Sequence, residues 1–86
     1  MVIDLRTEEE RTRKPLPSDI KIEIPKPPLG PSAICWSART LLDVAIEYDF
    51  DSEPVQVFCA KGVRSALAAS ILRASGYKVI DLGGVG

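Results

Sequence analysis

Six consecutive residues, Cys59 to Arg64, have the types and the spacing that could do chemistry in this chain. The cysteine follows the apolar run 55–58, and the amphipathic run 65–73 begins directly after the arginine. A cysteine between a strand and a helix start faces the unpaired N–H groups of the loop and of the first helical turn. These groups, the helix dipole and the cations Lys61 and Arg64 all lower the pKa of a thiol. We therefore expect Cys59 to be a nucleophilic thiolate at neutral pH.

The sequence contains no histidine, and this excludes several other uses of a reactive cysteine. Without an imidazole there is no Ser-His-Asp triad, no Cys-His protease pair and no histidine ligand for a metal. Two cysteines alone do not make an ordinary structural zinc site, so we expect neither a metal nor a cofactor. Gly83 to Gly86 is not a dinucleotide-binding fingerprint, because no helix follows it. The thiol must therefore be activated by its loop and by the helix dipole.

The elements that must position this loop alternate between strand and helix patterns. We expect strands at 2–5, 20–24, 55–58 and 78–82. We expect a short exposed helix over 7–14 capped by Thr7, an amphipathic helix over 33–48 capped by Ser32, and a helix over 65–75 with Gly76 in the C′ position. This alternation predicts an α/β domain whose small, mainly parallel sheet of about four strands is flanked by helices in three layers. A chain of 86 residues predicts one domain.

The pattern C-x-x-G-x-R-S over residues 59–65 resembles the active-site loop of the rhodanese family, the thiosulfate and persulfide sulfurtransferases. The resemblance covers nearly the whole chain. Residues 2–6 are similar to the D-x-R strand of that domain, 20–25 to its strand ending in Ile-Pro, and 76–84 to its strand and Gly-Gly pair. The family's G-H-I-x-G-A stretch is missing, and so are its first edge strand and its C-terminal helix.

The resemblance implies a single rhodanese-like domain over residues 1–86, with the strands in the spatial order 78–82, 55–58, 2–5, 20–24. The direction of the chain reverses between the strands 2–5 and 55–58. Ligands of open α/β sheets bind at the carboxyl ends of the strands at such a point. Cys59 and Arg6 both follow the ends of these two strands, so the fold and the loop indicate the same site.

The resemblance also implies a reaction, in which Cys59 accepts a sulfane sulfur, holds it as a persulfide and passes it to a thiol or to cyanide. The N–H groups of the active-site loop would stabilise the outer sulfur, as an oxyanion hole does. That loop comprises Ala60, Lys61, Gly62, Val63, Arg64 and Ser65. Lys61 either attracts an anionic donor such as thiosulfate or is a solvated lysine. We expect a positive φ at Gly62 and a capping role for Ser65.

Asp4, Arg6 and Arg64 have structural interpretations beside the functional one. Arg64 contacts a substrate anion, pairs with Asp4, or does both. Asp4 is expected to order the loop from the neighbouring strand. Arg6 is more typical of a scaffold residue, although it could reach a substrate anion.

The remaining residues of interest are expected to be structural. Cys35 is predicted to be a partly buried, small apolar residue rather than a resolving thiol, and Trp36 is predicted to pack. The run Glu8 to Glu10 is interpreted as a solvated face. The stripe of Leu41, Leu42, Ala45 and Ile46 is assigned to the core, and the proline-rich segment 25–31 to a stiff loop.

Two other functions fit parts of the sequence. A non-catalytic rhodanese-like interaction or regulatory module has the same fold, although such modules commonly lose the cysteine that this chain keeps. A Cys-dependent phosphatase or arsenate reductase usually has a C-x5-R loop, which is one residue longer, and a phosphatase needs an aspartic acid to protonate the leaving group.

Composition and charge define the expected partners. A net charge of −1 favours neither nucleic acid nor an anionic membrane, and no signal peptide pattern is present, so a cytoplasmic location is expected. The partners implied by the resemblance are a small anionic sulfur donor and a thiol or protein acceptor.

Without the family's first strand, the strand at 79–82 becomes an open sheet edge. This edge predicts either a homodimer or a cover formed by the tail Gly83 to Gly86.

Overall fold

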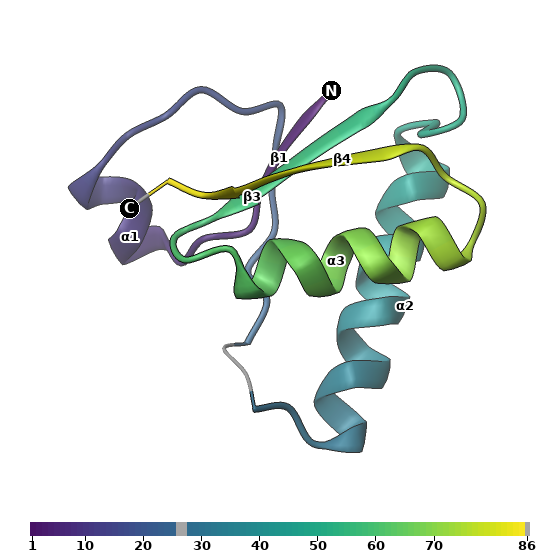
Figure 1. Cartoon of the computed structure of the whole chain (residues 1–86), viewed down its shortest axis with the longest axis horizontal. Helices are drawn as coiled ribbons and strands as arrows, with labels where there is room; N and C mark the ends of the chain where they lie inside the picture. The colour runs from purple at the N-terminus through teal and green to yellow at the C-terminus, as the bar shows by residue number, and fades with distance from the viewer. Residues whose placement is uncertain (26–27, 86) are drawn as a thin grey trace.

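The strands have the order that the sequence predicts, in a computed structural model that describes residues 1–25 and 28–85 (Figure 1). The sheet has four strands, all parallel, in the order β2-β1-β3-β4. The strands are β1 (Val2–Asp4), β2 (Ile20–Lys21), β3 (Val55–Cys59) and β4 (Val79–Gly84). The helices are α1 (Glu8–Arg13), α2 (Pro31–Glu47) and α3 (Val63–Ala74). The predicted α/β fold class with a small parallel sheet and flanking helices is confirmed.

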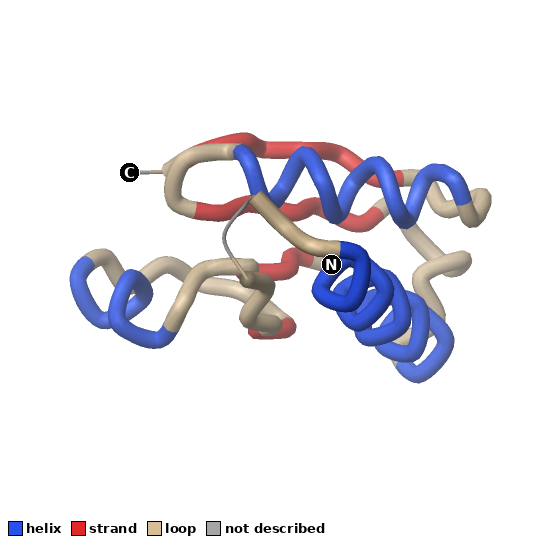
Figure 2. Tube along the Cα trace, turned by 90° about the horizontal axis from the view of Figure 1, so that it is seen from below, coloured by secondary structure: helices blue, strands red, loops and turns tan. Residues whose placement is uncertain are grey.

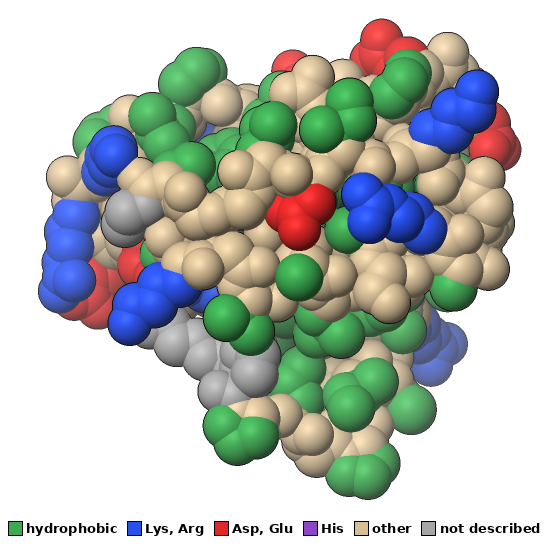
Figure 3. Space-filling model, viewed as in Figure 1, with side chains coloured by type: hydrophobic (Ala, Val, Ile, Leu, Met, Phe, Trp, Pro, Cys, Tyr) green, Lys and Arg blue, Asp and Glu red, His purple; other side chains and the backbone are tan. Residues whose placement is uncertain are grey.

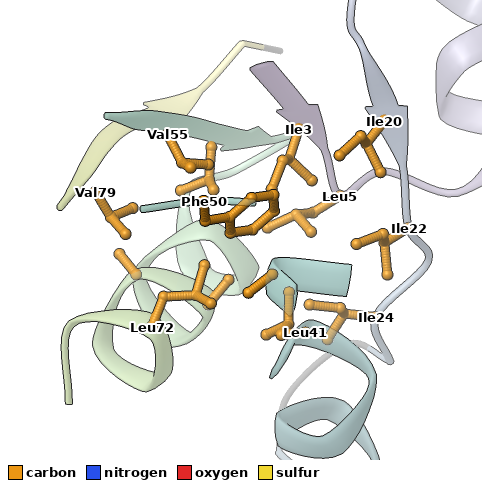
Figure 4. Close-up of a cluster of buried hydrophobic side chains, with 14 of the residues drawn as sticks. Ile3, Leu5, Ile20, Ile22, Ile24, Leu41, Phe50, Val55, Leu72 and Val79 are labelled. Atoms are coloured by element: carbon orange, nitrogen blue, oxygen red, sulfur yellow. The ribbon is translucent and has the colours of Figure 1, made fainter. Parts of the chain in front are cut away.

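One face of the sheet and two helices form the core. Side chains of β1, β3 and β4 point toward α2 and α3 in Figure 4, which also shows Phe50 in the middle of the cluster. The buried members drawn and labelled there include Ile3, Leu5, Val55, Leu41 and Leu72. In Figure 2, α3 runs alongside the sheet, whereas α1 lies apart from both other helices. Among the described residues, no helix has the length and apolarity needed to cross a membrane.

Helix α1 belongs to the opposite face of the sheet, at the carboxyl ends of the strands. Asp4, the last residue of β1, lies between the core residues Ile3 and Leu5, so its side chain is on the other face. Arg11 of α1 donates a hydrogen bond to the carbonyl oxygen of Asp4 over 3.2 Å. This contact places α1 over the end of β1, close to where β3 also ends (Figure 1).

Several element boundaries differ from the predictions. Helix α2 begins at Pro31 with Gly30 as its N-cap, not at 33 with Ser32, because a proline at the first helical position lacks only an N–H that would be unpaired anyway. Helix α3 begins at Val63, two residues earlier than predicted. Strand β2 ends at Lys21, although Ile22 and Ile24 remain buried. Lys26 and Pro27, part of the predicted stiff loop, lie outside the described residues.

The predicted core stripe on α2 is only partly correct. Leu41 and Ala45 are buried, whereas Ile46 is 74% exposed. At 100° per residue Ile46 lies about 140° from Leu41 around the helix, outside the stripe that faces the core. Trp36 is 52% exposed and Cys35 is also exposed, so the predicted packing of Trp36 and partial burial of Cys35 are wrong.

Strand β4 forms one edge of the sheet, as predicted. Ile80 and Leu82 are exposed, whereas Val79 is buried against α3. The N–H of Val85 donates to the carbonyl oxygen of Cys59 over 3.0 Å, so the chain after β4 continues along β3. It does not fold over the outer edge of β4 up to Val85, and Gly86 lies outside the described residues. The homodimer stays a prediction.

Candidate active site

The loop between β3 and α3 is short because a glycine in the left-handed region starts the helix. Cys59 is the last residue of β3, and Gly62 caps α3 with a φ of 89°. The predicted positive φ at Gly62 is therefore confirmed. A Cβ at this position would also lie 3.2 Å from the backbone nitrogen of Gly84, so both the conformation and the space favour glycine. The turn brings the first N–H groups of α3 back toward the end of β3.

Two backbone N–H groups converge on the sulfur of Cys59. The N–H of Gly62 donates to Sγ over 3.0 Å, and that of Ser65 over 3.3 Å. Burial raises the pKa of the Cys59 thiol, but hydrogen bonds from Ser65, Gly62 and Lys61 outweigh it, so the pKa lies below its usual range. The hydroxyl of Ser65 donates to the carbonyl oxygen of Gly62 over 3.1 Å, which fixes the turn. The loop thus favours a thiolate at Cys59.

Arg64 is held by Glu10, a residue that the sequence pattern predicted to be solvated. Its two terminal nitrogens donate to the two carboxylate oxygens of Glu10, over 2.9 and 3.0 Å. One of them also donates to the carbonyl oxygen of Leu5 over 3.3 Å. The predicted structural partner, Asp4, is wrong, because Glu10 takes both terminal nitrogens. The same ion pair lowers the pKa of Glu10 to about 2 and raises that of Arg64.

Glu10 is held in place by a capping box at the start of α1. The hydroxyl of Thr7 accepts the N–H of Glu10 over 3.2 Å, and the carboxylate of Glu10 accepts the N–H of Thr7 over 2.9 Å. One carboxylate therefore caps α1 and binds Arg64. The interpretation of Glu8 to Glu10 as a solvated face is wrong for Glu10. The spacing T-x-x-E was the sequence signal that could have identified it.

Asp4 and Arg6 form a fully buried ion pair. Both residues are 0% exposed, and Asp4 accepts bonds from the backbone N–H, Nε and a terminal nitrogen of Arg6 over 2.9, 3.0 and 2.9 Å. The other terminal nitrogen of Arg6 donates to the carbonyl oxygen of Lys14 over 2.8 Å. The guanidinium also lies 5.2 Å from the ring centroid of Phe58. Because all its nitrogens bond to protein oxygens, Arg6 supports β1 and does not reach a substrate anion.

Lys61 and Val63 are the exposed residues of the loop, and the thiol is covered. Lys61 is exposed, whereas Cys59 is 0% exposed and Ala60 8% exposed. Gly84 packs against this part of the loop so closely that a Cβ there would lie 2.7 Å from the carbonyl carbon of Lys61. A sulfur donor therefore reaches Sγ only when the loop opens.

Two comparisons of the sequence with known proteins find no match. A scan of the chain against protein-family models finds no match, and a search of curated proteins also finds none. Within residues 1–25 and 28–85, no three potential metal-ligating side chains gather at one place.

The lowered pKa of the Cys59 thiol predicts how the rate of its alkylation depends on pH. In a Cys35→Ser variant, alkylation of Cys59 by iodoacetamide is expected to have a midpoint below pH ~8.5, the pKa of an ordinary thiol. The plateau rate should be lower than in the denatured protein, because Sγ is covered. Mass spectrometry of samples quenched over time gives both quantities. A midpoint at or above that of the denatured protein would contradict the role of the N–H groups.

Proposed function

We propose that this protein is a rhodanese-type sulfurtransferase that carries a sulfane sulfur on Cys59. The observation that carries the proposal is the convergence of the N–H groups of Gly62 and Ser65 on Sγ at the end of a central parallel strand. The same groups that hold a thiolate can hold the outer sulfur of a persulfide after a small movement of the loop. The motif C-x-x-G-x-R-S supports the same assignment.

The proposed reaction has two displacement steps at sulfur. The Cys59 thiolate attacks the outer sulfur of thiosulfate, the S–S bond of the donor breaks, and sulfite leaves with its electron pair. The product is a Cys59 persulfide anion. An acceptor thiolate or cyanide then attacks the outer sulfur, and the electron pair of the breaking S–S bond returns to Sγ. Neither step needs a base at the site, because the attacking groups are already anions.

The state of Arg64 argues against a Cys-dependent phosphatase. Such an enzyme uses the arginine of its loop to hold the equatorial oxygens of a phosphate. In this protein both terminal nitrogens of Arg64 already bind Glu10, and the residue is 4% exposed. The arginine therefore orders the loop instead of facing a ligand.

The complete burial of Cys59 favours a second candidate, a non-catalytic rhodanese-like interaction or regulatory module. In such a module the loop would stay closed, and the thiol would be a packed core residue. The two candidates differ in one respect that can be measured, namely whether a sulfane sulfur can be transferred to Sγ.

Intact-protein mass spectrometry tests the proposal directly. After incubation with thiosulfate or sodium polysulfide, the protein is expected to gain the mass of one sulfur atom, and cyanide should remove it. Cys35→Ser, which removes the exposed thiol, should gain one sulfur, whereas the double variant Cys35→Ser with Cys59→Ser should gain none. If neither donor gave a cyanide-labile adduct on Cys59, the enzyme would be excluded and the interaction module retained.

A further inference from the structure

The positive charges around the loop are unequally available to a ligand. Arg64 is neutralised by Glu10, and Arg6 and Arg11 both face Asp4, at 2.9 and 3.5 Å. Among the described residues, Lys61 is the loop cation without a carboxylate within ion-pair distance. Lys61 is therefore the cation of the loop that can attract an incoming thiolate.

An apolar groove lies beside the same loop. It has a volume of about 280 Å³ and is lined by Leu29, Ile34, Val63 and Leu67. Val63 is 55% exposed and Ile34 43% exposed, although both are large apolar residues. Hydrophobic side chains gather on the surface where α3 begins and along α2 (Figure 3). Exposure of this apolar surface to water is unfavourable in free energy. An apolar group bound in the groove would remove that cost.

The groove and the sulfur share the first turn of α3. Val63 directly follows Gly62, and Leu67 lies one turn further on the same face of the helix. Gly62 and Ser65, from this same turn, donate the N–H groups that hold Sγ. A molecule seated between Val63 and Ile34 therefore lies against the turn whose N–H groups hold the sulfur.

We propose that this groove holds the apolar arm of the acceptor, so that the preferred acceptors are aliphatic thiols. The inference rests on the proposed sulfurtransferase function. The acceptor thiol loses its proton to water, and its thiolate, attracted by Lys61, attacks the outer sulfur of the Cys59 persulfide. The bond between the two persulfide sulfurs breaks, its electron pair returns to Sγ, and an alkyl persulfide leaves. Atoms and charge balance without an added oxidant or reductant.

The rate of transfer should then depend on the length of the acceptor. The Cys35→Ser protein is loaded with sodium polysulfide, the persulfide is verified by mass, and its loss is followed with ethanethiol, propanethiol and butanethiol. Each added methylene is expected to raise the second-order rate constant about three- to four-fold, the effect of burying one such group. The polar thiol 2-mercaptoethanesulfonate should be the slowest.

Two exposed isoleucines on α2 give a matched pair of variants. Ile34→Ser makes the groove polar without changing the loop, and it should reduce the dependence on chain length to less than two-fold per methylene. Ile46→Ser removes an isoleucine that is 74% exposed and is not part of the groove lining, and it should keep the full dependence. Because both positions are exposed, both variants are expected to fold.

The outcomes separate the inference from the function on which it rests. A persulfide that forms and reacts equally with all three alkyl thiols would overturn the groove proposal and leave the sulfurtransferase intact. An equal loss of the dependence on chain length in Ile34→Ser and Ile46→Ser would also overturn the groove proposal. Failure to form any persulfide would overturn the proposed function and the acceptor class together.

Discussion

Replacing Asp4 by asparagine is expected to lower the free energy of unfolding by about 3 to 5 kcal/mol, the usual cost of removing one partner of a buried ion pair. Arg6 is 0% exposed, so its charge would remain buried without a counter-ion. The asparagine side chain keeps only one acceptor oxygen. Its NH2 group would face the terminal nitrogen of Arg6 that donates to Asp4 over 2.9 Å, so two donors would meet. Arg11, 3.5 Å from the same carboxylate, loses its partner as well.

Urea unfolding followed by circular dichroism measures this loss. Asp43→Asn changes an exposed aspartate in the same way and should alter the free energy of unfolding by less than about 0.5 kcal/mol. The double variant Asp4→Leu with Arg6→Met removes both charges together and should recover much of the stability. A loss below about 1 kcal/mol for Asp4→Asn would show that water reaches Arg6, and the assignment of Arg6 to the scaffold would then be wrong.

The order of the strands could be predicted because it depends on patterns that extend along the chain. Each strand has a short apolar or alternating pattern, each crossover must be right-handed, and the resemblance to the rhodanese domain supplies the order. The structure has this order, β2-β1-β3-β4, with Cys59 at the carboxyl end of β3. The position of the thiol at the switch point follows from the topology and does not depend on any side-chain contact.

The partners of the charged residues could not be predicted in the same way. Both Asp4 and Glu10 are carboxylates within reach of the loop, and sequence spacing does not say which one an arginine will choose. Asp4 is taken by Arg6, two residues further along the chain, so Arg64 binds the carboxylate that α1 presents. The close approach of Gly84 to Ala60 and Lys61, next to Cys59, is also a tertiary contact that sequence spacing does not reveal.

Replacing Glu10 by glutamine is the second large effect that we expect, a loss of about 2 to 3 kcal/mol at neutral pH. The pKa of this carboxyl is lowered from 4.5 to about 2, chiefly by its hydrogen bonds to Arg64. A carboxyl with a lowered pKa in the folded state stabilises the protein above its unfolded pKa, and this contribution disappears as the pH falls through the folded value. The difference between wild type and Glu10→Gln should therefore be constant above pH ~5 and shrink between pH ~4.5 and ~2.

Glu9 provides the control for this variant, on the same helix and with its own ion pair. Glu9 and Arg13 are 2.6 Å apart, but both side chains are 74% exposed, whereas the side chains of Glu10 and Arg64 are 16% and 5% exposed. Glu9→Gln should cost less than about 0.5 kcal/mol and show little dependence on pH, because water screens the pair. Equal losses in the two variants would contradict the assignment. A larger loss at Glu10 would mean that α1, although short, is fixed to the loop by one carboxylate that also caps the helix. The stability of α1 and the position of Arg64 next to the thiol would then depend on the same residue.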